Sequence, residues 1–203
     1  MFIGAQVSLY PMTSDFVGVI TSSLSALDPY RDQLRIETDD ISTLMVGAPD
    51  PLLDAIRDLF ATAAKGPNHV TMHVTLSRGC PGEPDDPTCR CEVLAVAQDQ
   101  TLAQRQKLAL ASVTNAPTFG VEIDVQFSLY VLGSGAHMDE IYGCIDFLKG
   151  SGVFLRSKNF CTRLRGDAGA VFETLRQAFL RFGPAQGHVT IDLTASANSP
   201  SLR

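Results

Sequence analysis

The feature that most constrains the fold of this chain is an internal repeat. The segment 6–10, Gln-Val-Ser-Leu-Tyr, recurs at 126–130 as Gln-Phe-Ser-Leu-Tyr, and His-Val-Thr at 69–71 recurs at 188–190. These and other matches keep their order along the chain with a nearly constant offset. A collinear set of this kind predicts two copies of one structural unit.

Each copy shows the hydrophobic periodicities of the order β-α-β-β-α-β. For the first copy the pattern predicts strands over 4–10, 34–36, 41–46 and 69–77, and helices over 14–27 (with Ser14 and Asp15 as caps) and 50–64. For the second copy it predicts strands over 122–131, 152–157, 160–165 and 188–195, and helices over 137–149 and 168–182. This order is typical of the α+β ferredoxin-like plait with an antiparallel sheet. We therefore expect one unit at 1–78, a linker with a helix at 79–120, and a second unit at 121–203.

The strands predict a sheet with one apolar and one polar face. Gln6, Ser8 and Tyr10 alternate with apolar residues, and the same triplet recurs as Gln126, Ser128 and Tyr130. A polar face of this kind is either solvated, packed against another sheet or part of a pocket. The two tyrosines favour packing, between the two sheets of one chain or between the sheets of two chains.

Composition and charge exclude several classes of function. The formal net charge is −6, whereas a nucleic-acid-binding surface is basic. No apolar run approaches the ~20 residues of a membrane span, and no signal peptide is recognisable, so we expect a cytoplasmic protein without membrane insertion. The five cysteines are an odd number and predict free thiols. The spacing of Cys80, Cys89 and Cys91 does not match a zinc site, so no metal is expected.

Catalytic constellations are absent from the sequence pattern. His69 and His188 each begin a strand after a turn, where a hydrogen-bonded structural histidine is more common than a base. Gly133-Ser134-Gly135 is a weak anion-binding signal, and no residue near Cys80 pairs with it as a base. We expect a protein that is not an enzyme and needs no cofactor.

Several short motifs, taken together with the duplication, resemble the YkoF family of thiamin- and hydroxymethylpyrimidine-binding proteins. They are Ser-Leu-Tyr-Pro-Met-Thr at 8–13, Asp-Phe at 15–16, Asp-Ile-Ser-Thr at 40–43, Gly-Cys-Pro-Gly at 79–82 and Ser-Ala-Asn-Ser-Pro-Ser at 196–201. The resemblance runs from about Val7 to Ser201. It implies two ferredoxin-like, ACT-like units, a homodimer, and non-catalytic binding of thiamin or its pyrimidine precursor, with a role in salvage or transport. An ACT-like regulatory module that signals to a protein partner is the alternative.

The resemblance and the residue chemistry together imply a site in each unit. The implied ligand-binding residues are Ser8, Tyr10, Met12, Asp15, Phe16, Asp40, Ser42 and Thr43 in the first unit, and Ser128, Tyr130, Asn159 and Thr162 in the second. Hydroxyls and carboxylates suit an aminopyrimidine, and an aromatic face with a carboxylate such as Asp15 or Asp39 suits the thiazolium cation.

The second unit departs from the first in charge. Asn159 replaces Asp40, Ala136 replaces Asp15, and Arg163 and Arg165 replace two apolar residues. We therefore expect the second site to bind a cationic ligand less well than the first, or to prefer the neutral pyrimidine.

Overall fold

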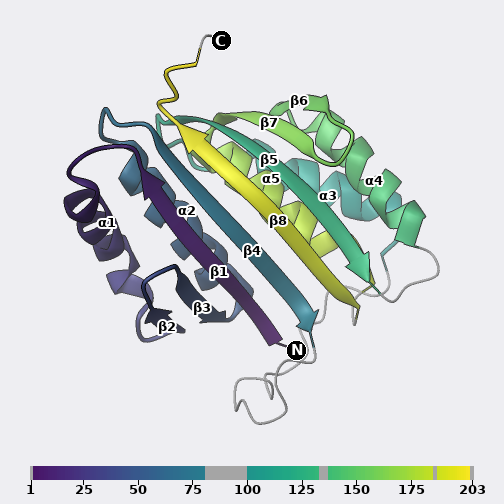
Figure 1. Cartoon of the computed structure of the whole chain (residues 1–203). Helices are drawn as coiled ribbons and strands as arrows, with labels where there is room; N and C mark the ends of the chain where they lie inside the picture. Colours follow the sequence, from purple (N-terminus) through teal and green to yellow (C-terminus); the bar gives the residue numbers. More distant parts are fainter. Residues whose placement is uncertain (1, 81–99, 133–136, 185–186, 202–203) are drawn as a thin grey trace.

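The computed structural model describes residues 2–80, 100–132, 137–184 and 187–201. Its strands form one antiparallel eight-stranded sheet in the order β2-β3-β1-β4-β8-β5-β7-β6, and the helices cover one face of it (Figure 1). The chain is thus an α+β protein made of two similar halves.

The observed elements follow the predicted order. In the first half they are β1 (Phe2–Pro11), α1 (Phe16–Leu24), the 3-10 helix η1 (Ser25–Tyr30), β2 (Leu34–Thr38), β3 (Thr43–Gly47), α2 (Pro49–Ala64) and β4 (Val70–Cys80). In the second they are α3 (Leu102–Thr114), β5 (Glu122–Leu132), α4 (His137–Gly150), β6 (Phe154–Ser157), β7 (Thr162–Asp167), α5 (Ala168–Arg181) and β8 (His188–Ala197).

The first predicted helix is wrong in two respects. It ends as an α-helix at Leu24 and continues as η1, which contains Pro29. Proline has no backbone N–H for the bond of an α-helix, so a tighter turn is the natural continuation. Asp15 occupies the N-cap position, but its side chain makes no capping hydrogen bond.

Alternating apolar residues place the core between the sheet and the helices. Ile3, Ala5 and Val7 of β1 are buried, and their partners come from α2, where Leu52 and Ile56 are buried. The period of two in the strand and the period near four in the helix each direct an apolar side to the same layer. The opposite face of the sheet carries the polar side chains.

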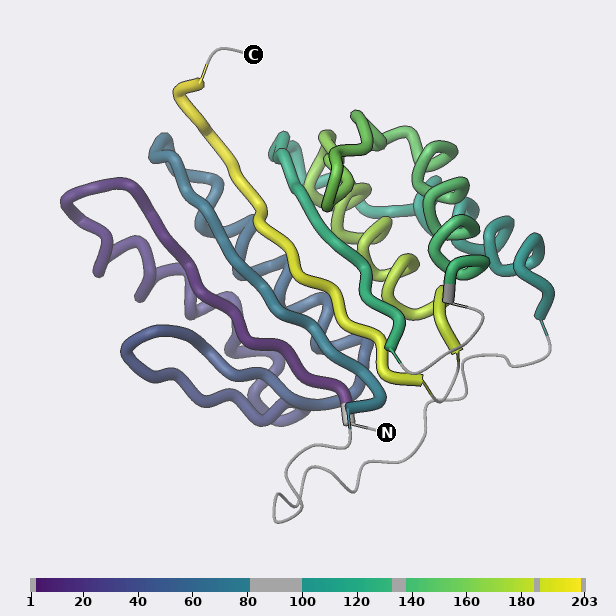
Figure 2. The backbone as a smooth tube through the Cα atoms, turned by 45° about the vertical axis from the view of Figure 1, so that its right-hand side comes forward, coloured from purple at the N-terminus to yellow at the C-terminus, as the bar shows by residue number. Residues whose placement is uncertain are grey.

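The two halves are joined edge to edge. β4 pairs antiparallel with β8, and Val74 lies opposite Leu193, its counterpart in the repeat. Figure 2 shows the two strands running side by side through the centre of the molecule. The expectation that the two sheets of one chain pack face to face is therefore wrong, because backbone hydrogen bonds across β4 and β8 continue one sheet through both halves.

A buried arginine also ties the halves together. Arg78 of β4 is 1% exposed and donates to the backbone carbonyls of Phe179, Phe182 and Pro184, beside the C-terminal end of α5. Burial lowers the pKa of Arg78 to about 10. A cation at this end of a helix satisfies carbonyls that have no partner within the helix.

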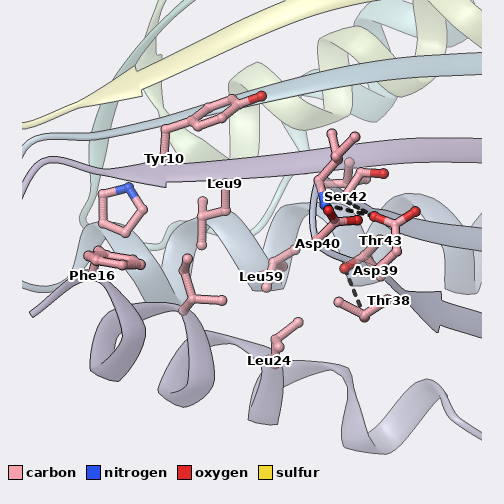
Figure 3. Close-up of a pocket in the computed structure, with 14 residues that line it drawn as sticks. Leu9, Tyr10, Phe16, Leu24, Thr38, Asp39, Asp40, Ser42, Thr43 and Leu59 are labelled. Carbon is pink, nitrogen blue, oxygen red and sulfur yellow. Dashed lines mark hydrogen bonds between the residues drawn. The ribbon is translucent and has the colours of Figure 1, made fainter.

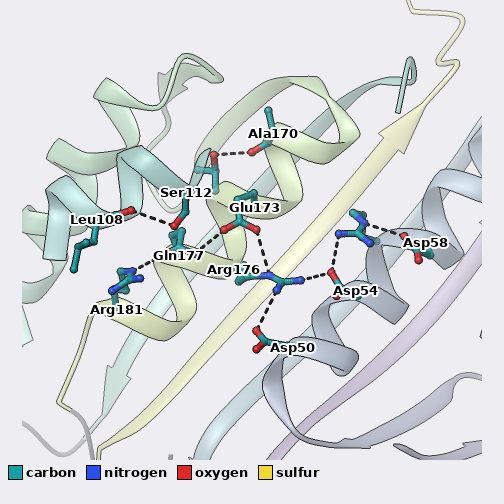
Figure 4. A network of polar contacts seen from close by, with 12 residues as sticks. Asp50, Asp54, Asp58, Leu108, Ser112, Ala170, Glu173, Arg176, Gln177 and Arg181 are labelled. Carbon is teal, nitrogen blue, oxygen red and sulfur yellow. Dashed lines mark hydrogen bonds and ion pairs between the residues drawn. The ribbon is translucent and has the colours of Figure 1, made fainter. Parts of the chain in front are cut away.

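The helix layer carries a second link between the halves. Arg176 of α5 binds Asp54 and, at 3.1 Å, Asp50, both in α2 (Figure 4). Within the first half, Arg57 binds Asp54 and Asp58 at 2.7 and 2.8 Å. Ionic contacts therefore bridge the helices of the two halves above the β4–β8 junction.

Helix α3 lies in the predicted linker and is bound to the second half. Arg105 of α3 binds Glu140 of α4 at 2.7 Å, and Gln106 donates to the carbonyl of Gly143 at 2.8 Å. No helix in the described part of the chain combines the length and hydrophobicity that crossing a bilayer requires.

Candidate ligand-binding site

A gap in strand pairing creates a pocket in the first half. β3 pairs with β1 only from Gly4 to Val7, because β3 begins at Thr43 and the turn that precedes it, between β2 and β3, leaves the edge of β1. The rest of β1 therefore faces α1 across an unfilled edge, which leaves a pocket of about 340 Å³ (Figure 3). Its lining residues are Val7, Leu9, Tyr10, Pro11, Phe16, Ile20, Leu24, Thr38, Asp39, Asp40, Ile41, Ser42, Thr43 and Leu59.

The pocket has an apolar floor and a polar wall. Leu9, Leu24 and Leu59 supply the floor, while the turn between β2 and β3 supplies hydroxyls and carboxylates. Such a mixture is typical of pockets that bind small organic molecules, in which a few polar groups set the orientation of the ligand.

Hydrogen bonds within the turn fix the polar wall. The Asp39 carboxylate accepts from the backbone N–H groups of Ile41 and Ser42, both at 2.8 Å, and these bonds lower the pKa of Asp39. The hydroxyls of Thr38 and Thr43 lie 3.0 Å apart. The Gln6 amide donates to the Ser42 hydroxyl, and a side-chain hydrogen bond from Ser42 also helps to lower the pKa of Asp39.

The structure brings together most, but not all, of the residues predicted for the first site. Those that line the pocket are Tyr10, Phe16, Asp40, Ser42 and Thr43, and those that do not are Ser8, Met12 and Asp15. Ser8 is 8% exposed, on the polar side of β1, and Met12 is 58% exposed. The pocket lies between β1 and α1. Ser8 is on the polar side of β1 and away from the end of that strand, so its side chain does not reach the pocket.

Sequence reasoning missed the apolar floor. Leu9, Ile20 and Leu24 follow the spacing of core residues, and they are indeed only partly exposed. These residues differ from the rest of the core because they lie beyond the place where β3 stops pairing with β1. The hydrophobic pattern of the sequence does not show where that pairing stops.

An equivalent pocket of about 250 Å³ lies in the second half. Pairing of β5 with β7 stops at Phe127 and Thr162, the counterparts of Val7 and Thr43. The lining residues are Phe127, Ser128, Leu129, Tyr130, Ile141, Cys144, Ile145, Leu148, Ser157, Lys158, Asn159, Phe160, Cys161 and Thr162. All four residues predicted for the second site, Ser128, Tyr130, Asn159 and Thr162, are among them.

The second pocket is closed differently. The Ser128 hydroxyl donates to the carbonyl of Phe160 at 2.7 Å, which links β5 to the turn between β6 and β7. Cys144 forms part of the wall, and burial raises the pKa of its thiol. At neutral pH this cysteine is therefore a neutral, weakly polar surface.

The charge of the two turns is opposite. Lys158 and Asn159 stand where the first pocket has Asp39 and Asp40, and Lys158 donates to the side-chain carbonyl of Gln126 at 3.0 Å.

The expected contribution of Arg163 and Arg165 to the second site is wrong. Both bind Asp124, at 2.8 and 3.0 Å, and neither lines the pocket. Burial alone would raise the pKa of Asp124, but hydrogen bonds from Arg165 and Arg163 outweigh it and lower that pKa. The positive charge of the second pocket comes instead from Lys158.

The histidines are held by hydrogen bonds, as predicted. His69 lies 3.0 Å from the Ser196 hydroxyl, and His188 lies 3.0 Å from that of Ser77. Within the described residues no group of three or more His, Cys, Asp or Glu side chains is placed to hold a metal ion. Cys89, Cys91 and Gly133-Ser134-Gly135 lie outside the described residues.

The fold and the two pockets define an α+β protein of two similar halves, each with an equivalent small-molecule-sized cavity. The chain belongs to the YKOF-related family, whose model matches residues 2–83 and 122–202. It is 32% identical, over 200 residues, to the Bacillus subtilis (strain 168) protein named "Putative HMP/thiamine-binding protein YkoF". That alignment covers 98% of this chain and 92% of the relative.

Proposed function

We propose that this chain is a non-catalytic binding protein for thiamin or its hydroxymethylpyrimidine precursor, acting in salvage or transport of that precursor. The observation that carries the proposal is the first pocket, of about 340 Å³, which combines an apolar floor with a wall of hydroxyls and carboxylates. The name of the Bacillus subtilis relative supports the same class of ligand.

The pocket chemistry suits an aminopyrimidine. The flat ring would lie on the apolar floor beside Leu9, and the Asp40 carboxylate would accept from the exocyclic amine. The hydroxyls of Ser42 and Thr43 would donate to the ring nitrogens. The thiazolium of thiamin carries a positive charge, which the ring of Tyr10 and the carboxylate of Asp39 would favour.

The family resemblance extends this proposal to fold type and assembly. Each half would be a ferredoxin-like, ACT-like unit of a tandem duplication, and two chains would form a homodimer through the polar face of the sheet. Tyr10 and Tyr130 support this interface, because they are 51% and 49% exposed there. The free thiols of Cys80, Cys144 and Cys161 fit a cytoplasmic location. Analytical ultracentrifugation of the wild type and of Tyr130→Ser would test the dimer.

Calorimetric titration of the full chain with thiamin, and separately with hydroxymethylpyrimidine, tests the binding proposal. We expect saturable heat with each compound, with tighter thiamin binding in the first pocket. Asp40→Asn should weaken thiamin binding there, whereas Asp32→Asn, an exposed residue outside the pocket, is the matched control. Absence of heat with both compounds would refute the proposal. Chromatography after prolonged incubation would reveal any turnover and so refute the non-catalytic part.

A second candidate function is that of an ACT-like regulatory module that senses a ligand and signals to a protein partner. The exposure of the two turn tips favours it: Ile41 is 73% exposed and Phe160 is 90% exposed, each at the rim of a pocket. Affinity capture with and without thiamin would distinguish the two functions, since a regulatory module should retain a partner in one condition and release it in the other.

A further inference from the structure

The strand-turn-strand segments that form the polar walls of the two pockets differ in net charge. The first, residues 34–43, contains Arg35, Glu37, Asp39 and Asp40, and the second, residues 153–162, contains Arg156 and Lys158. Corresponding backbone bonds close both turns, from the N–H of Asp39 to the carbonyl of Ser42 and from that of Lys158 to that of Cys161. The same backbone shape therefore presents an acidic wall in one half and a basic wall in the other.

The two cations of the second segment have no carboxylate partner within the described residues. Lys158 is bound to the neutral Gln126 amide at 3.0 Å, and the side chain of Arg156 makes no hydrogen bond or ion pair with a described residue. Their neighbours Arg163 and Arg165, by contrast, share the carboxylate of Asp124, and the negative charge of Glu122 also acts on Arg165. The uncompensated positive charge of this edge is thus concentrated on Arg156 and Lys158.

A shallow basic recess adjoins the second pocket. It measures about 560 Å³ and adds Gln126 and Arg156 to residues that also line the pocket. The residues common to both hollows are Ser157, Lys158, Asn159, Phe160 and Cys161. The turn therefore separates an apolar pocket from a basic recess, and the same side chains line both hollows. Lys158 is one of these shared side chains.

We propose that the second half binds a phosphate monoester of the same heterocycle, with the ring in the pocket and the phosphate in the recess. This inference rests on the proposed function. Lys158 would act as a point charge beside the phosphate, and the guanidinium of Arg156 would donate paired hydrogen bonds to its oxygens. The first half would bind the neutral or cationic form of the ligand, since Asp39 and Asp40 would repel a phosphate.

The test uses hydroxymethylpyrimidine, its phosphate monoester and inorganic phosphate as separate calorimetric titrants of the full chain. We expect the monoester to bind one site per chain at least about tenfold more tightly than the unphosphorylated compound binds that site, because charge-assisted hydrogen bonds are added. The variant Arg156→Gln/Lys158→Gln should lose this gain. The control Lys65→Gln/Lys107→Gln changes the net charge equally at exposed positions outside both hollows and should keep it.

A second variant does not depend on the two cations. Asn159→Asp restores the carboxylate found at Asp40 and should weaken the monoester at least about tenfold while leaving the unphosphorylated compound bound. If hydroxymethylpyrimidine binds but its monoester gains nothing, or the gain survives in Arg156→Gln/Lys158→Gln, the inference is wrong and the proposed function stands. If neither hydroxymethylpyrimidine nor its monoester binds, the inference is wrong, and the proposed function is then decided by the titration with thiamin. Binding of inorganic phosphate with an affinity equal to that of the monoester would also overturn the inference, since the ring would then contribute nothing.

Discussion

Nε2 of His73 lies 2.9 Å from Oδ2 of Asp192, and the two residues occupy corresponding positions in the two halves. They flank the centre of the β4–β8 junction. On either side of them the same hydrogen bond occurs twice, between His69 and Ser196 and between His188 and Ser77, and each of these residues corresponds to one in the other bond. The centre of the junction thus carries complementary residues where strict symmetry would require identical ones.

Replacing Asp192 by His would place two histidines at this centre. Both positions are about half exposed, with side chains 42% and 50% accessible, so we expect the free energy of unfolding to fall by less than about 1 kcal/mol. The exchanged pair His73→Asp/Asp192→His should recover it, because the two positions are equivalent. Urea unfolding of the wild type, the two single variants Asp192→His and His73→Asp, and the exchanged pair measures the coupling. Failure of the exchanged pair to recover stability would show that the surroundings of the two positions differ.

Arg78→Met should be among the most destabilising substitutions in the chain. It removes the three hydrogen bonds to the carbonyls of Phe179, Phe182 and Pro184 and leaves buried acceptors without partners. We expect a loss of about 3 kcal/mol or more in the free energy of unfolding, measured in urea. Arg31→Met, at an exposed residue, should cost less than about 0.5 kcal/mol. Equal effects of the two variants would contradict the role assigned to Arg78.

We expect the protein to lose stability against unfolding in acid, because of the environment of Asp167. Its carboxylate accepts from the N–H groups of Phe119, Gly120 and Gly169. Burial would raise its pKa, but these bonds outweigh that effect and hold the pKa below the ordinary 3.8. Because the folded-state pKa is the lower one, the stabilisation is complete above pH 3.8 and disappears as the pH falls through the folded-state value.

The variant Asp167→Asn tests this sign. At neutral pH it should be less stable than the wild type by about 1–2 kcal/mol, because hydrogen bonds to a charged acceptor become hydrogen bonds to a neutral one, and the difference should shrink as the pH falls below 3.8. Thermal or urea unfolding across the acid range measures it. A difference that grew toward acid pH would contradict the assignment.

We expect thiamin binding in the first pocket to depend on the aromatic ring of Tyr10. Tyr10→Leu should weaken thiamin binding in the first pocket about two- to fivefold, the size of an exposed cation–π contact, whereas Tyr10→Phe should retain the affinity. Tyr130→Leu, the counterpart in the second pocket, should leave the first event unchanged. Calorimetry distinguishes the three variants. An equal loss for Tyr10→Phe and Tyr10→Leu would assign the effect to the hydroxyl.

Sequence periodicity was sufficient for the order of the elements, because alternation in strands such as β4 and the apolar stripe of α2 record burial directly. It could not show how the halves join, since Val74 and Leu193 would be buried under helices in either arrangement. The pockets were found in part. Polar residues such as Ser42 and Thr43 stand out in an apolar pattern, but Leu9 and Leu24 have the same spacing whether they fill a core or line a cavity. The sequence analysis assigned the positive charge of the second site to Arg163 and Arg165 and overlooked Lys158, whose place in the pocket depends on the turn.

The continuous sheet has a consequence for how the two pockets can differ. An assembly of two identical chains of half this length would carry every substitution twice, so its two pockets would always have the same charge. Joining β4 and β8 within one polypeptide removes that restriction. Asp40 and Asn159 occupy corresponding positions of the two halves but are encoded separately, so a substitution can change either pocket while the other stays as it is.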